Sequence, residues 1–237
     1  MTMLRFYFIV LFAGVPLLSE AATLRVEIDG SGDYTSIQAA VDAAEDGDTI
    51  LIGPGRYDEF TECAPLRSAV VSYNTPKSLT FQGAGVDQTI VGPEDPVDVP
   101  YWSHICFYLV GDSVTTRVCD ITMEHVDKPC FWQEGDSRLE IERCRFNEAD
   151  GGIKVFVRQG GWVRDCEFIN MTGMNLSSSI DIVPPTTNFT IERCRFDNFL
   201  MGVSSHWPEC YDILVSDCEF IDGESGVRVV DGASTTV

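Results

Sequence analysis

A short pattern of apolar and polar positions recurs through the second half of the chain. In the segment LEIERCRF, Leu139–Phe146, two alternating apolar residues are followed by two charged residues and then by Cys144 and Phe146. The same frame is found at Val114–Ile121, Gly161–Phe168, Phe189–Phe196 and Ile213–Phe220. Its cysteines are spaced 25, 22, 28 and 24 residues apart, at Cys119, Cys144, Cys166, Cys194 and Cys218. A near-constant period with insertions of variable length predicts a solenoid with one structural ladder of cysteines.

The phase of the alternation changes inside each copy. Strand side chains point to opposite faces in turn, but Leu139 and Ile141 have one parity and Cys144 and Phe146 the other, so we place a corner between them. Two columns of charge flank the cysteine and alternate in sign: Arg117, Glu142, Arg164, Glu192 and Ser216 before it, and Asp120, Arg145, Glu167, Arg195 and Glu219 after it. Coils stacked at about 4.8 Å would bring opposite charges together. The columns therefore predict a fixed register between coils.

Each coil from Val114 onwards is expected to carry a third strand after its Cys-x-Phe segment. These strands are predicted at Cys130–Trp132, Ile153–Val157, Ile180–Val183, Val203–Ser205 and Val227–Val230. Two stretches rich in Pro, Asp and Ser, Asp58–Pro76 and Pro93–Ser103, are typical of loops that leave the coil. The last residues, Ala233–Val237, resemble the start of another coil without a terminal cap, so we expect a C-terminus that is either incomplete or covered by a partner.

The N-terminal part of the chain has a different pattern. A strand is predicted at Leu24–Ile28, and Thr35 with Gln38 forms a capping box that opens a short helix. The helix is expected to end near Gly47, before a second strand at Thr49–Ile52.

Composition and charge indicate an exported, soluble chain of one domain. Arg5, the apolar run Phe6–Leu18 and the small residues around Glu20 predict a signal peptide over residues 1–21. Residues 22–237 are then expected to form the solenoid domain, and no later stretch is predicted to cross a membrane after signal cleavage. The net charge of −21 argues against nucleic acid as a partner. We expect a secreted, periplasmic or cell-surface protein.

Nine cysteines in an exported chain leave at least one thiol unpaired. We expect the five cysteines of the repeat to stay reduced and to act as small apolar fillers. Four others lie outside the repeat and are predicted to be bridged: Cys63, Cys106, Cys130 and Cys210. No pattern of Cys and His residues predicts a metal site.

Several stretches resemble a known superfamily. The segments Asp29–Ala44, Gly47–Tyr57, Leu79–Gly85 and Thr89–Gly92 are similar to the start of pectin lyase-like proteins, and of pectin methylesterases in particular. This resemblance implies an all-β fold, a right-handed parallel β-helix solenoid with a short N-terminal capping α-helix. The QAVAL and QDTL segments of the esterases are absent, as are the NTD, DD, GHG and RIK segments of polygalacturonases and the RxPxxR segment of pectate lyases. The resemblance therefore implies the fold and carries over no catalytic residue.

The outward positions of the third strands give the candidate site. One column is predicted as Phe131, Lys154, Asp181, Ser204 and Arg228, beside a second column of Phe156, Val183 and His206. Lys154, Asp181 and His206 are candidate catalytic residues because acid–base chemistry needs titratable groups within reach of each other. Trp207, Phe156 and Trp102 are candidate sugar-stacking residues. Lys154 and Asp181 fit equally well as an ion pair between stacked coils, with the aromatic residues covering coil edges.

Two functions follow from this column. The first is a non-catalytic solenoid that presents one face to a polysaccharide or to another cell-surface component, and a purely structural module fits nearly as well. The alternative is a carbohydrate-active enzyme, a polysaccharide lyase or glycoside hydrolase. Cofactors are not expected, although the acidic composition permits Ca²⁺ bound by loop carboxylates.

Overall fold

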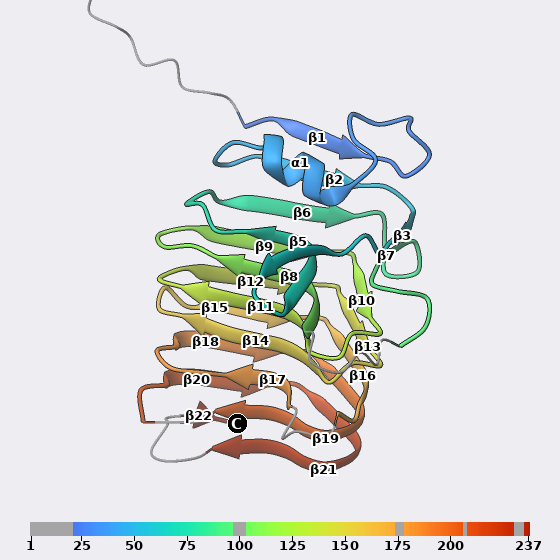
Figure 1. The fold of residues 1–237 in the computed structure, drawn as a ribbon. Helices are drawn as coiled ribbons and strands as arrows, with labels where there is room; N and C mark the ends of the chain where they lie inside the picture. Colours follow the sequence, from blue (N-terminus) through green and yellow to red (C-terminus); the bar gives the residue numbers. More distant parts are fainter. Residues whose placement is uncertain (1–20, 97–102, 174–177, 206–207, 230–234) are drawn as a thin grey trace, which may run out of the picture.

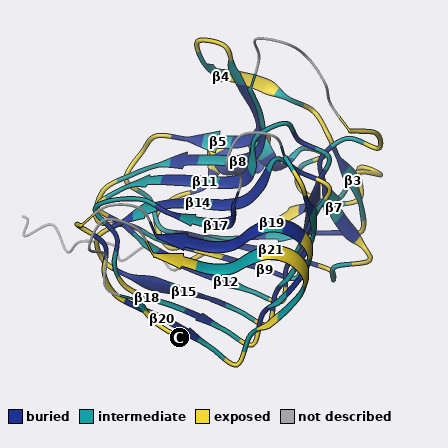
Figure 2. Cartoon of the chain, turned by 90° about the horizontal axis from the view of Figure 1, so that it is seen from below, coloured by how far each residue is buried: buried dark blue, intermediate teal, exposed yellow. Residues whose placement is uncertain are grey.

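The computed structural model describes residues 21–96, 103–173, 178–205, 208–229 and 235–237. In these ranges the strands wind into a parallel β-helix whose coils are stacked from β1 at one end to β21 and β22 at the other (Figure 1). Seen along its axis, the coil has three faces, which we call A, B and C (Figure 2). The predicted all-β solenoid with one short helix is confirmed for the described residues.

Face A is a nine-stranded parallel sheet within the described residues. Its strands are β1 (Thr23–Val26), β2 (Thr49–Ile52), β6 (Leu79–Gly83), β9 (Thr115–Cys119), β12 (Arg138–Glu142), β15 (Gly161–Arg164), β18 (Thr187–Glu192), β20 (Tyr211–Ser216) and β22 (Thr235–Thr236). Each neighbouring pair in this order is parallel, as a solenoid requires.

Faces B and C form one continuous sheet because two long strands run around the corner between them. Face B contains β3 (Gly55–Tyr57), β7 (Thr89–Val91), β10 (Thr122–Glu124), β13 (Arg145–Asn147) and β16 (Glu167–Met171). Face C contains β5 (Arg67–Tyr73), β8 (Ser103–Val110), β11 (Pro129–Gly135), β14 (Gly151–Val157) and β17 (Ser178–Ile182), and the outlying strand β4 (Thr61–Ala64) pairs with the edge of β5. The strands shared by both faces are β19 (Arg195–Ser205) and β21 (Glu219–Val229).

The stretch Asp58–Pro76 is not a loop, as the sequence suggested. It contains β4 and β5, which pair antiparallel to each other, and β5 continues in parallel to β8. Ala69 and Val71 are fully buried, so the apolar middle of β5 faces inward, as it does in a solenoid strand. The third face therefore begins two coils earlier than Val114, and β4 projects away from the three faces (Figure 2).

Helix α1 (Ile37–Ala43) covers the N-terminal end of the coil (Figure 1). Its N-cap is Ser36, whose hydroxyl accepts a hydrogen bond from the Ala39 amide at 3.2 Å, and not Thr35 as the capping box predicted. Ser36 has extended backbone angles and is the last residue before the helical turn, which explains the shift. Ile37 and Val41 are buried against the first coils. No helix in the described part of the chain is long and apolar enough to cross a membrane.

The register between coils corrects the alignment of the first repeat. Thr122 pairs with Arg145 and Met123 with Phe146, which places Ile121 beside Cys144. Cys119 instead pairs with Glu142, two positions away from the cysteine column. The apolar inward positions set this register, and the cysteine of the first copy matched the pattern by coincidence. Four of the five predicted ladder residues share one column: Cys144, Cys166, Cys194 and Cys218.

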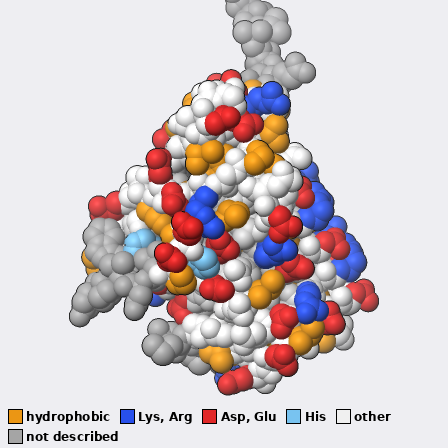
Figure 3. Space-filling view, turned by 90° about the vertical axis from the view of Figure 1, so that its right-hand side faces the viewer, with side chains coloured by type: hydrophobic (Ala, Val, Ile, Leu, Met, Phe, Trp, Pro, Cys, Tyr) orange, Lys and Arg blue, Asp and Glu red, His pale blue; other side chains and the backbone are white. Residues whose placement is uncertain are grey.

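The corner between faces A and B carries a third alternating column of charge. It consists of residues with positive φ, where the chain turns: Asp120, Arg143, Asp165, Arg193 and Asp217. Arg143 binds both carboxylate oxygens of Asp120 at 2.8 and 2.9 Å, and Arg193 binds both of Asp165 at 2.8 Å. Basic and acidic side chains are accordingly interspersed on the side of the molecule seen in Figure 3. The register of the corner is thus held by paired charges.

The two predicted charge columns hold for four of their five members. In the first column, each residue pairs with the next on the neighbouring strand in the order Glu142, Arg164, Glu192 and Ser216. The second column is paired in the same way in the order Arg145, Glu167, Arg195 and Glu219. Arg117 pairs with Glu140 instead of Glu142, and Asp120 belongs to the corner column, because the first repeat is shifted by two residues.

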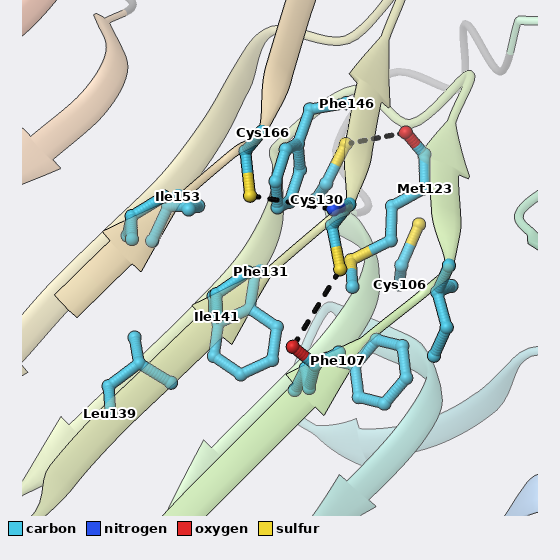
Figure 4. Packing of buried hydrophobic residues seen from close by; sticks show 14 of the residues in the cluster. Cys106, Phe107, Met123, Cys130, Phe131, Leu139, Ile141, Phe146, Ile153 and Cys166 are labelled. Carbon is cyan, nitrogen blue, oxygen red and sulfur yellow. Dashed lines mark hydrogen bonds between the residues drawn. The ribbon is translucent and has the colours of Figure 1, made fainter. Parts of the chain in front are cut away.

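Phenylalanine rings and thiols fill the interior (Figure 4). The rings of Phe146, Phe168, Phe196 and Phe220 stack one above the other, with centroids 4.7–4.8 Å apart and planes within 8°. Cys106 and Cys130 are buried next to Phe107 and Phe131, and both are free thiols, as is Cys63. The prediction that these three are bridged is wrong. Cys106 and Cys130 are equivalent residues on the parallel strands β8 and β11, so their side chains point in the same direction and their sulfurs do not meet in disulfide geometry. Cys210 is buried, with its Sγ 3.8 Å from the Ile182 carbonyl oxygen.

Candidate functional site

The outward column of face C contains four of its five predicted members. Lys154 pairs with Asp181, Asp181 with Ser204, and Ser204 with Arg228. Phe131 does not belong to this column, because Trp132 pairs with Lys154 and Phe131 is fully buried. Strand residues alternate between the two sides, so an error of one position exchanged an inward ring for an outward one. The candidates His206, Trp207 and Trp102 lie outside the described residues.

The two catalytic candidates that the structure describes are in contact. The Lys154 Nζ lies 3.9 Å from the Asp181 Oδ2, and the Ser204 hydroxyl lies 3.2 Å from the Asp181 Oδ1. The side chains of Lys154 and Asp181 are 28% and 25% exposed, so both are half-buried but reachable from solvent. The pair joins adjacent coils, as an ion pair between stacked strands does.

Two aromatic side chains extend this column toward the N-terminal coils, and a third, Phe156, lies beside Lys154 on β14. Tyr108 on β8 meets Trp132 on β11 edge to face, with ring centroids 5.9 Å apart. The Arg67 guanidinium lies 4.5 Å from the centroid of Tyr108 and 4.3 Å from that of Trp132. On the next coil, the Lys154 Nζ lies 4.8 Å from the Trp132 centroid and 5.6 Å from that of Phe156. We call these five residues, Arg67, Tyr108, Trp132, Lys154 and Phe156, the face C strip.

The strip combines cations with aromatic faces in a partly desolvated place. A cation within about 6 Å of a ring centroid is attracted by the ring quadrupole. Burial raises the pKa of Tyr108, and the negative charge of Glu134 raises it further. Tyr108 is therefore a neutral hydroxyl across the physiological pH range, able to donate a hydrogen bond.

Sequence reasoning missed Arg67, Tyr108 and Trp132. Trp132 was available from the alternation alone, since its neighbour Phe131 is inward. Arg67 lies in the stretch that was interpreted as a loop, and Tyr108 lies outside the repeated frame, so neither could be aligned with Lys154 without the register of β5 and β8.

Two hollows adjoin the strip. The first, which we call the α1 hollow, has a volume of about 470 Å³ and is lined by residues of α1, β4, β5 and β8, with Tyr108 among them. The second, which we call the Glu134 hollow, has a volume of about 600 Å³ and is lined by Glu134, Phe156, Arg158 and neighbouring residues. The strip therefore runs along the solenoid axis from one hollow to the other. Among the described residues, no group of three or more His, Cys, Asp or Glu side chains is placed to hold a metal ion.

Comparison with known proteins supports the fold of this chain. A model of the family described as the right handed beta helix region matches residues 103–237, more than half of the sequence. A rhamnogalacturonan lyase structure superposes with a TM-score of 0.64 and 13% identity, over 91% of this chain and 66% of its own. The crystal structure of pectate lyase Pel9A gives a TM-score of 0.60 and 14% identity, over 84% of this chain and 54% of its own. Comparison with curated proteins gave no match.

These comparisons bear on the resemblance seen in the sequence. The chain spans about two thirds of one similar structure and about half of the other, at identities that show the fold alone. The right-handed parallel β-helix that this resemblance implied is confirmed. Because the family model covers more than half of a chain whose described strands form the same architecture, this protein belongs to the right handed beta helix family.

Proposed function

We propose that this protein is an exported β-helix that binds an anionic polysaccharide along the face C strip, without cleaving it. The observation that carries the proposal is the set of two cations held over three aromatic rings on one outward face. Arg and Lys bind carboxylates through charge-assisted hydrogen bonds. Tyr and Trp offer apolar ring area with a polar edge, which suits the mixed surface of a sugar.

The charge distribution supports an acidic ligand at this place in spite of the net charge of −21. Charges farther away than a Debye length of about 8 Å are largely screened at physiological salt. Within that distance Arg67 and Lys154 offer positive charge to a bound carboxylate, beside the carboxylates of Asp181 and Glu134. The similar structures are a rhamnogalacturonan lyase and a pectate lyase, so a polysaccharide ligand accords with the fold.

The test compares two tryptophans that are alike except for their face. Trp132 lies under Lys154 and Arg67 on face C, and Trp162 on face A lies under Arg164, whose Cζ is 4.6 Å from the ring centroid. Calorimetric titration with polygalacturonate is expected to show binding that Trp132→Ala weakens at least about tenfold, or about 1.4 kcal/mol. Trp162→Ala is the control and should bind like the wild type.

Lys154→Gln gives a second test that keeps the volume of the side chain. It should weaken binding of polygalacturonate and leave the weak binding of a neutral polymer such as dextran unchanged. Titrations with a chelator and with added Ca²⁺ test whether calcium contributes to binding, the third hypothesis raised by the acidic composition. Equal affinity for the neutral and the acidic polymer, or full binding by both Trp132→Ala and Lys154→Gln, would refute the proposal.

A lyase is the second candidate, and the Lys154–Asp181 contact is the observation that favours it. A lysine amine beside a bound uronate is a chemically competent base for proton abstraction. Against this, the contacts of Lys154 with Asp181 and with the rings of Trp132 and Phe156 are those of a charged ammonium. Absorbance of unsaturated product and release of reducing ends would establish a lyase, provided that Lys154→Gln and Asp181→Asn abolish both.

A further inference from the structure

The stack of strands on face C ends at helix α1. The outer edge of β5 is bonded there by a side chain, because the Ser72 amide donates to the Gln38 Oε1 at 2.7 Å. The Gln38 Nε2 in turn donates to the Ser72 carbonyl at 2.9 Å. One side-chain amide thus makes the two hydrogen bonds that a further parallel strand would make. Face A continues past this level with β1, whereas on face C only the antiparallel strand β4 pairs with the first residues of β5.

The α1 hollow lies at this end of the face. Gln38 and Asp42 of α1 line it, together with Thr61 of β4, Asn74 beyond β5, and Tyr108 of β8. Strand β4 stands out from the coil and adds a second wall (Figure 2). The volume of about 470 Å³ lies in the range of about 300–1,000 Å³ that small-ligand sites occupy. Hydroxyl and amide groups beside the rings of Tyr73 and Tyr108 suit a single sugar unit.

The face C strip leads into this hollow. Tyr108 belongs to both, and its ring contacts Trp132 on the next coil. In the other direction, strands β17, β19 and β21 continue face C beyond the Glu134 hollow. A polysaccharide that lies along the strip can therefore continue over these strands toward the C-terminal coils, and it meets α1 and β4 at the other end.

We infer that the site recognises the end of a polysaccharide chain, with the terminal unit in the α1 hollow and the following units on the face C strip. The inference rests on the proposed function, since it concerns how the same ligand is held. An interior segment of a long chain would have to pass over α1 or β4 to occupy the hollow. A chain end fills it without crossing either wall.

The number of protein molecules bound to each polysaccharide chain tests this inference. Polygalacturonate fractions of increasing length are titrated calorimetrically with the whole protein, at equal molar concentration of chains. End recognition predicts one protein per chain at every length. The inference is overturned if the number of bound protein molecules rises in proportion to chain length. If Trp132→Ala still abolishes that binding, the proposed function stands. If no fraction binds, the proposed function is overturned as well.

A variant whose α1 hollow is filled by a side chain tests the inference independently, through its binding of short polysaccharide fractions. Asn74 is exposed, so Asn74→Trp is expected to fold and to occupy the α1 hollow with its indole ring. This variant should bind the short fractions at least about tenfold more weakly than the wild type. The control is Gln82→Trp, which adds the same side chain to an exposed position of β6 on face A. Equal binding of short fractions by Asn74→Trp, Gln82→Trp and the wild type contradicts the inference.

Discussion

Replacing Phe168 by alanine is the sharpest test of how the coils are held together. The Phe168 ring is fully buried between two nearly parallel rings. Its centroid lies 4.7 Å from the centroid of Phe146 and 4.8 Å from that of Phe196. Phe→Ala substitutions in cores cost about 3–5 kcal/mol, and the value depends on how far the site can collapse. Here the flanking rings belong to coils whose spacing is fixed by hydrogen-bonded strands, so the cavity cannot close. We expect a loss of about 4 kcal/mol in the free energy of unfolding.

The matched comparison is Phe220→Ala at the end of the same stack. Phe220 is only partly buried, and among the stacked rings it contacts Phe196 alone, at 4.8 Å. Phe220→Ala should lower the free energy of unfolding by about 2 kcal/mol, half the value for Phe168→Ala, because it removes one stacked contact and less apolar area. Urea unfolding followed by both tryptophan fluorescence and far-ultraviolet circular dichroism measures the two losses. A smaller loss for Phe168→Ala than for Phe220→Ala would refute the reasoning.

Two further predictions concern charge and pH. Burial raises the pKa of Tyr73 to about 12, while its hydrogen bond with Thr116 opposes the rise. The folded state therefore holds the Tyr73 proton more tightly than the unfolded state, whose pKa is near 10.0, so stability is complete below that pH and falls as the pH rises toward 12. Tyr73→Phe should remove up to about 1.4 kcal/mol of this alkaline loss, measured as the difference between the free energies of unfolding in urea near pH 7 and at about pH 11. For the exposed pair of Asp165 and Arg193, whose bonds lower the pKa of Asp165, a double-mutant cycle should give a small favourable coupling at neutral pH. That coupling should vanish as the pH falls through and below the ordinary value of 3.8, because stability from a carboxyl with a lowered pKa is lost on protonation.

The repeat was sufficient to predict the fold, but it did not fix every register. Strand Thr49–Ile52 was predicted with its observed bounds, and the corner after Glu142 follows directly from the change of parity. The first repeat was misaligned because a cysteine was used as its anchor, whereas packing depends on apolar volume. Ile121 fills the position next to Cys144 as well as a thiol does.

The candidate site was only partly predictable for a related physical reason. Lys154 and Asp181 could be matched because both follow a recognisable copy of the repeat. The cations and rings on the earlier coils come from β5 and β8, which no copy precedes. Their alignment with Lys154 depends on hydrogen bonds between strands far apart in sequence. A pattern within one strand contains no information about which residue of another coil lies beside it.

The pairing of charges at the corner clarifies why face C is the place for an anionic ligand. Arg143 contacts Asp120 and Glu142, and Arg193 contacts Asp165 and Glu192, so each corner cation has two carboxylate partners. A polyanion at the corner would have to displace these carboxylates. Arg67 forms no ion pair with any residue that the structure describes, and it lies on ring faces that hold its position without neutralising its charge. The charges that set the register of the solenoid are therefore separate from the charge that remains available to a ligand.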